Sequence, residues 1–278
     1  MTTLEESAAL NVAREHDAAG RHGEALETLK RAAGTGDLVA TSELGHRLLV
    51  GVRAPKMVKQ ALALLAAAAR GDEGRALARM AALTAAGAYL QQDWPAALRM
   101  LAAAAVAGDE GAQGQLQCLQ PPGAGGTDWN AMHARGHGIP GGTDWNAMAA
   151  RVPLEHWLAA APVAGLEPRV GQVSQLCPAP ACEWLIARSR SRLERALVYD
   201  AFERREMAHE MRTNTAANFD YATLDVVQFL VQARMARTCT QRMQQFEAPM
   251  VLHYSPGEQI KPHFDFIDTN APDYEQQI

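Results

Sequence analysis

The chain has 278 residues, enough for about two domains at roughly 150 residues each. It carries 26 basic and 31 acidic residues, and the resulting formal charge of −5 excludes a general electrostatic attraction to nucleic acid or to an anionic membrane. Hydrophobic residues make up 48% and charged residues 21%, a balance that is typical of a globular chain and excludes wholesale disorder.

Targeting and redox signals indicate a cytoplasmic protein. The amino terminus has no basic stretch followed by an apolar core, so no signal peptide is predicted. The longest apolar run, Ala61 to Ala69, is too short to span a bilayer. The cysteines show no CxxC pair and no regular spacing, at Cys118, Cys177, Cys182 and Cys239. We therefore expect reduced thiols and no structural zinc site.

The first part of the chain contains an internal repeat. Gly-Asp occurs at 36–37, 71–72 and 108–109, and an Ala-Leu pair lies 10 or 11 residues upstream of each. The stretch between each pair and its Gly-Asp is rich in alanine, which lets antiparallel helices approach closely. A period in the mid-thirties predicts helix–turn–helix units, with Gly ending one helix and Asp capping the next.

Residues 40–51, ATSELGHRLLVG, followed by Lys59–Asp72, resemble the Sel1-like branch of the tetratricopeptide superfamily. The resemblance implies that residues 1–120 form an α-helical repeat solenoid with a concave surface for a protein partner. A plain helical bundle without a partner is the alternative. Trp94, next to Pro95, is expected to pack at a helix start.

Residues 121–168 are predicted to be a Gly/Pro-rich linker. The sequence GGTDWNAM occurs twice, at Gly125–Met132 and Gly141–Met148, and each copy offers a Gly-Gly break, a Thr or Asp cap and a short helix. His133 and His137 have a spacing that could bind a metal on a helix. The glycines on either side of His137 argue against a helix there.

The sequence from residue 169 onward alternates helices and strands. We expect a strand at 169–177, a helix at 178–196 entered through Pro180, and extended segments at 196–200 and 212–219. A second helix at 224–240 is expected to be capped by Thr223, and residues 247–268 to form strand, Pro-Gly turn and strand. The residues expected on the apolar faces of the two helices are Trp184, Leu185, Leu193 and Leu197, then Val226, Val227, Leu230, Val231 and Met235. This order fits a helix-backed barrel or sandwich.

His263-Phe264-Asp265 is the clearest candidate for chemistry. Residues i and i+2 of a strand project to one face, so this imidazole and this carboxylate can converge on one ion. They supply two ligands of a 2-His-1-carboxylate facial triad for iron.

The segment Tyr254–Asp265 is close to the pattern Y-x-x-G-x-x-Y-x-x-H-x-D, and residues 169–278 resemble the prolyl 4-hydroxylase-like branch of the iron(II)/2-oxoglutarate-dependent dioxygenases. The resemblance implies an α+β multidomain chain with a C-terminal double-stranded β-helix (jelly roll). It implies Fe(II) on His263 and Asp265, 2-oxoglutarate held in part by Tyr254, and ascorbate to reduce the iron. Arg212 and Glu247 match positions near the substrate groove. The implied substrate is a peptidyl residue, prolyl in the family that the chain resembles, or a related compound.

The sequence departs from this family in two places. Ile260 replaces the usual aromatic residue, and no histidine follows Asp265. We therefore expect the chain to be the front portion of a longer hydroxylase, with an incomplete jelly roll and no turnover of its own. The alternative is a non-catalytic helical-repeat interaction scaffold with a degenerate oxygenase remnant.

Overall fold

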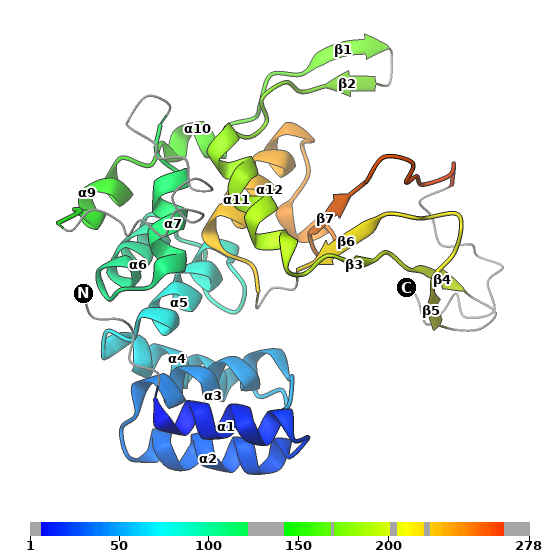
Figure 1. Cartoon of the computed structure of the whole chain (residues 1–278). Helices are drawn as coiled ribbons and strands as arrows, with labels where there is room; N and C mark the ends of the chain where they lie inside the picture. Colours follow the sequence, from blue (N-terminus) through cyan, green and yellow to red (C-terminus); the bar gives the residue numbers. More distant parts are fainter. Residues whose placement is uncertain (1–6, 122–141, 168–169, 201–204, 220–222, 264–278) are drawn as a thin grey trace. The chain divides into compact units, whose positions relative to one another are not determined.

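A computed structural model describes residues 7–121, 142–167, 170–200, 205–219 and 223–263 (Figure 1). The chain forms two compact units. One, here called the helical unit, comprises Met1–Trp184 and Asp220–Glu247; the other, the strand unit, comprises Leu185–Phe219 and Ala248–Ile278. Each unit groups residues that pack together in space. The division of the chain into domains at 1–120, 121–168 and 169–278 stays a prediction.

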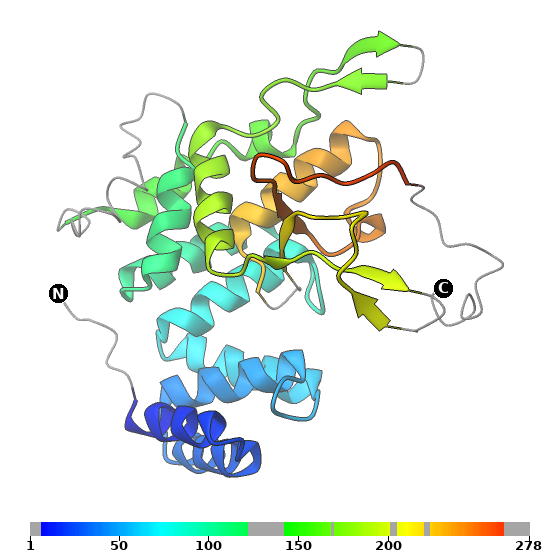
Figure 2. The same ribbon diagram turned by 45° about the vertical axis from the view of Figure 1, so that its right-hand side comes forward.

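The helical unit is built from antiparallel helix pairs. Helix α1 packs on α2, α3 on α4 and α5 on α6, while α7 and α9 both pack mainly on α6. The first two pairs lie side by side in both views (Figures 1 and 2). The predicted helical repeat is therefore confirmed. The helices are α1 (Ala8–Ala18), α2 (His22–Gly34), α3 (Leu38–Val50), α4 (Val58–Arg70), α5 (Gly74–Ala86), α6 (Trp94–Val106), α7 (Glu110–Cys118), α9 (Trp145–Ala150) and α10 (Leu154–Leu158).

The repeat has a constant period of 36 residues in its caps. The carboxylates of Asp37, Glu73 and Asp109 accept the backbone N–H three residues later, at 2.9, 2.6 and 2.7 Å, and so cap α3, α5 and α7. The other ends of α3 and α5 close on Gly51 and Gly87, both left-handed. The N-terminal cap and the helix-ending glycine therefore recur at equivalent positions of successive repeats.

The middle Gly-Asp turn differs from the prediction by one residue. The left-handed positions are Gly36, Asp72 and Gly108, with φ of 94°, 59° and 91°, so Asp72 occupies the glycine position and does not cap α5. Gly71 has an ordinary φ of −92°. It is required for another reason, because a Cβ there would lie 2.5 Å from Cδ1 of Leu38.

Replacing Asp72 by glycine should therefore raise the free energy of unfolding by about 0.5–1 kcal/mol, since glycine adopts positive φ without a steric penalty. Urea denaturation checks this. The matched variant is Gly36→Ala, where a Cβ has open space, so the backbone alone should lower stability by about 1 kcal/mol. A loss of stability in Asp72→Gly would show that the carboxylate matters more than the backbone.

The core of the array follows the Ala-Leu pairs. The alanine of each pair, Ala25, Ala61 and Ala97, is fully buried. The leucine four residues further on, at 29, 65 and 101, is fully buried as well. These positions are one helical turn apart and lie on the same face of α2, α4 and α6. Trp94 is also buried, at the first position of α6, as predicted.

Helix α12 (Val226–Thr238) belongs to the helical unit, where it packs on α5 and α10. Its cap is Asp225 and not the predicted Thr223. Asp225 accepts the N–H of Gln228 at 2.9 Å, and the Gln228 side chain accepts the N–H of Asp225 at 3.1 Å. The predicted apolar face is confirmed except for Met235, which is 40% exposed.

The second copy of GGTDWNAM also forms a short helix in this unit. Asp144 caps α9 by accepting the N–H of Ala147 at 2.9 Å, and Trp145 is buried. The first copy, with His133 and His137, lies outside the described residues. The unit also contains a hairpin of β1 (Ala164–Glu167) and β2 (Val170–Gln172), and the 3₁₀ turn η1 (Met243–Gln245).

The predicted helix at 178–196 is α11 (Ala179–Arg190), and it ends before two of its expected apolar residues. Trp184 is buried, but Leu193 and Leu197 follow the helix, and Leu197 is 39% exposed.

The described part of the strand unit contains two small sheets. The first has the order β3-β6-β7 and is antiparallel throughout; the second is the hairpin β4-β5. The jelly roll implied by the resemblance is not shown by these residues. The strands are β3 (Glu194–Arg195), β4 (Val198–Asp200), β5 (Arg205–Met207), β6 (Thr215–Asn218) and β7 (Met250–His253).

Candidate functional site

The segment with the predicted iron motif runs along one partner segment of the strand unit. Strand β7 pairs with β6, from Asn218 opposite Met250 to Thr215 opposite His253. Further along, Thr213 donates its N–H to Gln259 O at 2.9 Å, and Lys261 donates to Met211 O at 2.8 Å. Both flanks of the Pro-Gly turn therefore pair with the same stretch, 211–218.

The predicted strand, Pro-Gly turn and second extended segment therefore do not form a hairpin with each other. Residues 254–258 form a loop inserted in one edge, and the chain continues in its original direction. The loop is closed by the N–H of Glu258, which donates to Ser255 O at 2.9 Å, while the Ser255 N–H donates to the Glu258 carboxylate at 2.7 Å. Gly257, at φ 91°, provides the left-handed residue that the loop needs.

Arg212 lies next to the motif segment. It forms an isolated antiparallel bridge with Ile260, which lies between Tyr254 and His263 in the sequence. Its guanidinium donates to Asn214 Oδ1 at 3.2 Å and to Met250 Sδ at 3.3 Å. The backbone thus brings together two parts of the predicted site that are almost 50 residues apart in the chain.

The remaining predicted site residues are placed as follows. Tyr254 is 39% exposed, and His263 is exposed with Nδ1 at 2.9 Å from Lys261 O. Asp265 lies outside the described residues. Glu247 is exposed and belongs to the helical unit. Within the described ranges, no group of three His, Cys, Asp or Glu side chains could hold a metal ion. The ligand pair His263 and Asp265 therefore stays a prediction.

In the helical unit, the first helices of successive pairs lie next to one another. Helix α1 contacts α3, and α3 contacts α5; we call the surface that they share the A-helix face. Helix α12, from a segment distant in sequence, packs on α5. The N–H of Val226, at the start of α12, donates to Gln115 Oε1 of α7 at 2.9 Å.

The A-helix face is more open on α3 than on α5. Ala82 and Ala86 of α5 are each 7% exposed. The residues 36 positions earlier, His46 and Val50 of α3, are half-buried. The repeat thus offers equivalent positions that are buried on α5 and partly accessible on α3.

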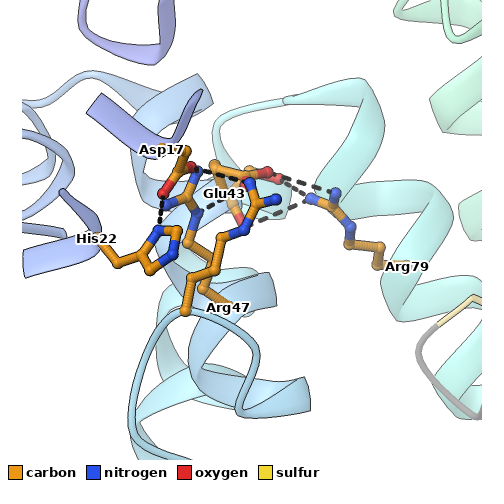
Figure 3. A network of polar contacts seen from close by, with 7 residues as sticks. Asp17, His22, Glu43, Arg47 and Arg79 are labelled. Atoms are coloured by element: carbon orange, nitrogen blue, oxygen red, sulfur yellow. Dashed lines mark hydrogen bonds and ion pairs between the residues drawn. The ribbon is translucent and has the colours of Figure 1, made fainter. Parts of the chain in front are cut away.

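A polar network connects α1, α2, α3 and α5 (Figure 3). Arg47 Nη2 lies 2.6 Å from Asp17 Oδ2, and Arg47 Nε donates to Glu43 Oε1 at 2.9 Å. His22 Nδ1 lies 3.0 Å from the other oxygen of Asp17. Figure 3 shows Glu43 between Arg47 and Arg79, and Arg79 Nη2 is 3.8 Å from Glu43. The side chains of Asp17 and Arg47 are only 3% and 7% exposed.

The environment of Asp17 favours its charged form. Burial by itself would raise the pKa of this carboxyl. The hydrogen bonds from His22 and Arg47, with the charges of Arg47 and Arg53, outweigh burial and hold the pKa below its ordinary value. The network is therefore an element of stability, since its partners neutralise a buried charge.

This pKa shift predicts a specific acid sensitivity. A carboxyl with a lowered pKa in the folded state stabilises the fold above its unfolded pKa of about 3.9, and the contribution disappears as the pH falls through the folded value. The free energy of unfolding of the native chain, measured by urea denaturation, should decrease below about pH 4. The Asp17→Asn variant should be less stable at neutral pH, and its free energy of unfolding should decrease less steeply as the pH falls. Glu27→Gln, at an exposed ion pair, is the control; equal slopes for native chain and Asp17→Asn would contradict the assignment.

This network was not predicted from the sequence. The signal was present, because Glu43 and Arg47 stand four residues apart within a helix whose other residues are mainly apolar. Two charges on a buried helix predict partners in neighbouring helices. The identity of those partners, Asp17 and Arg79, depends on how the helices stack.

No protein-family model and no curated protein matches the chain. Among solved structures, the crystal structure of a Sel1 repeat protein from Oxalobacter formigenes is similar over 54% of this chain and 60% of that chain, with 20% sequence identity and a TM-score of 0.38. The match thus spans less than two thirds of that protein. At these values it assigns no family, and the repeat is defined by the chain's own helices and caps. None of the described helices combines the length and hydropathy needed to cross a membrane.

Proposed function

We propose that the helical unit is a protein-interaction module whose A-helix face binds an amphipathic helix of a partner. The observation that supports this proposal is the packing of α12 on α5. A helix from a distant part of the chain already lies against one A helix, with Val226, Val227 and Leu230 fully buried. The same face continues over α3, where the equivalent positions are half-buried.

The partner is described by the chemistry of the α3 surface. Val39, Glu43, His46 and Val50 share one face of α3 at helical spacing, and all four are partly exposed. A partner helix with an apolar stripe for the valines and a polar group near Glu43 and His46 would complement this surface.

A library of displayed amphipathic helical peptides, selected on the immobilised full chain, tests the proposal. Selected peptides should lose at least tenfold in affinity on Val50→Lys, because a charge would then stand in the apolar contact, at a cost of about 1.4 kcal/mol or more. Ala63→Lys, on the exposed surface of α4, is the matched control and should leave affinity unchanged. Selection of no peptide, or of peptides that bind Val50→Lys equally well, would contradict the proposal.

We further propose that the strand unit carries remnants or part of an iron(II)/2-oxoglutarate-dependent dioxygenase. The observation that favours this is the backbone pairing that sets Arg212 beside Ile260, within the segment Tyr254–Asp265. His263 and Asp265 would hold Fe(II), Tyr254 would donate a hydrogen bond to 2-oxoglutarate, and ascorbate would keep the iron reduced. These groups would supply oxidative hydroxylation of a peptidyl substrate. Arg212 would orient that substrate.

Metal binding tests this second proposal without requiring turnover. Co(II), a spectroscopic substitute for Fe(II), should bind the full chain weakly but saturably, because only two of the three ligands are present, and both His263→Ala and Asp265→Ala should weaken binding more than tenfold. His253→Ala, at an exposed histidine of β7, is the control. If the native chain does not bind Co(II), or if binding survives His263→Ala, the iron site is wrong.

A further inference from the structure

Two cysteines of the helical unit share a pocket that neither proposed function uses. The pocket has a volume of about 810 Å³ and is lined by Cys177 and Cys182 together with polar side chains, among them Gln117, His156, Gln175 and Glu183. The Cys182 side chain is exposed and that of Cys177 is half-buried. Both sulfurs are therefore within reach of a small solute that enters the pocket.

The local backbone holds the two cysteines close together. They bracket the sequence Pro-Ala-Pro-Ala at the start of α11. Ala181 and Cys182 both donate their N–H groups to Pro178 O, at 3.0 and 3.2 Å, so the chain turns directly after Cys177. Each proline fixes its own φ, which leaves little conformational freedom between the two thiols.

The two thiols also interact with each other. Burial first, and then the charge of Cys182 and a hydrogen bond with it, outweigh the opposing charge of Arg234 and raise the pKa of Cys177 to about 11. The remaining cysteines differ. Burial, followed by the charge of Asp225, raises the pKa of Cys118 well above its ordinary value, and no solute reaches that sulfur. Cys239 is exposed and does not line this pocket.

We propose that Cys177 and Cys182 are a thiol–disulfide exchange site. A small-molecule disulfide such as oxidised glutathione oxidises the two thiols to an intramolecular disulfide. This proposal is independent of both proposed functions. The disulfide would link Cys177, two residues before α11, to the first turn of that helix, near Trp184, whose Nε1–H donates to Asp225 Oδ2 at 2.9 Å. It would therefore stiffen the start of α11 near the cap of α12.

The exchange proceeds in two steps. The Cys182 thiolate attacks one sulfur of oxidised glutathione, so a mixed disulfide forms at Cys182 and one glutathione thiolate leaves. The Cys177 thiolate then attacks the Cys182 sulfur, the bond to glutathione breaks, and the second glutathione leaves. The two cysteines lose two electrons and two protons, and oxidised glutathione becomes two molecules of reduced glutathione.

The order of the steps follows from accessibility and acidity. Cys182 carries the exposed sulfur, so it is the thiol that reacts first with oxidised glutathione. In the mixed disulfide Cys182 carries no charge, so burial is the cause that keeps the pKa of Cys177 above its ordinary value during the second step. The Cys177 thiolate therefore limits that step, and the rate of the step should rise with pH between about 7 and 9, as the thiolate fraction does.

Peptide mapping of the full chain tests the proposal. The folded protein is equilibrated with glutathione buffers of increasing oxidised fraction, quenched with an alkylating reagent and digested. A linked peptide containing Cys177 and Cys182 should replace the two separately alkylated cysteines. Cys118 should become alkylated only when the protein is unfolded. Cys177→Ser should stop the reaction at the Cys182–glutathione adduct, and Cys239→Ala should change nothing.

Two results would overturn the proposal. In one, the native chain accumulates the Cys182–glutathione adduct to the same extent as Cys177→Ser, which would show that Cys177 does not resolve it. In the other, both thiols remain free at every ratio of oxidised to reduced glutathione. A pH-independent second step, with the linked peptide still formed, would refute the assigned order of attack.

Discussion

Replacing Arg47 by alanine should lower the free energy of unfolding by about 3–5 kcal/mol, because it leaves the buried carboxylate of Asp17 without its main partner. The Arg47 side chain is 7% exposed and that of Asp17 is 3% exposed, so water cannot replace the lost contact. The same substitution removes the hydrogen bond to Glu43 and leaves that carboxylate dependent on Arg79. Urea denaturation followed by circular dichroism measures the change.

The control for Arg47→Ala is Lys30→Ala, which removes an ion pair between side chains that are 46% and 69% exposed. Such pairs contribute about 0–1 kcal/mol, so this variant should be nearly as stable as the native chain. The double variant Asp17→Asn/Arg47→Met removes both buried charges and should recover part of the loss. If Arg47→Ala and Lys30→Ala destabilise equally, the network has no structural role.

The repeat could be predicted from the sequence because its signal is local. Ala25, Ala61 and Ala97 each precede a leucine and recur at one constant period, and each is fully buried. Helix length, caps and turn residues are encoded within about 15 residues of each such position. The one-residue error at Gly71 arose because glycine there meets a packing requirement, the contact with Leu38, which no local pattern reveals.

The cap of α12 could have been predicted correctly from the same local information. Asp225 is followed three residues later by Gln228, which is the capping-box spacing, whereas Thr223 is followed by Val226. The burial of individual residues is a different problem. Met235 fits the apolar stripe but lies on a part of α12 that α5 and α10 do not cover, so it is 40% exposed.

The strand unit was the hardest part of the fold to predict from the sequence, because its strands pair with segments that are distant in the chain. The Pro-Gly turn at 256–257 has the composition of a hairpin turn, and composition alone predicts a reversal of the chain. The structure instead pairs both flanks of the turn with residues 211–218. A ladder between segments almost 40 residues apart is set by tertiary contacts. For the same reason the neighbourhood of Arg212 and Ile260 could not be read from either segment alone.

The second large effect is expected in α12. Phe229→Ala should lower the free energy of unfolding by about 3–5 kcal/mol, because the side chain is fully buried and its removal leaves a cavity. Met235→Ala, in the same helix but at a 40% exposed position, should change stability by less than about 0.5 kcal/mol. Thermal unfolding monitored at 222 nm compares the two variants.

The comparison also tests where α12 belongs. If α12 is part of the helical unit, Phe229→Ala must shift the main helical transition, because α5 and α10 lose a packed neighbour together. If α12 were an independent element, the variant would melt a small fraction of the helix early and leave the main transition unchanged. Met235→Ala separates packing from helix propensity, since both variants introduce the same alanine into the same helix.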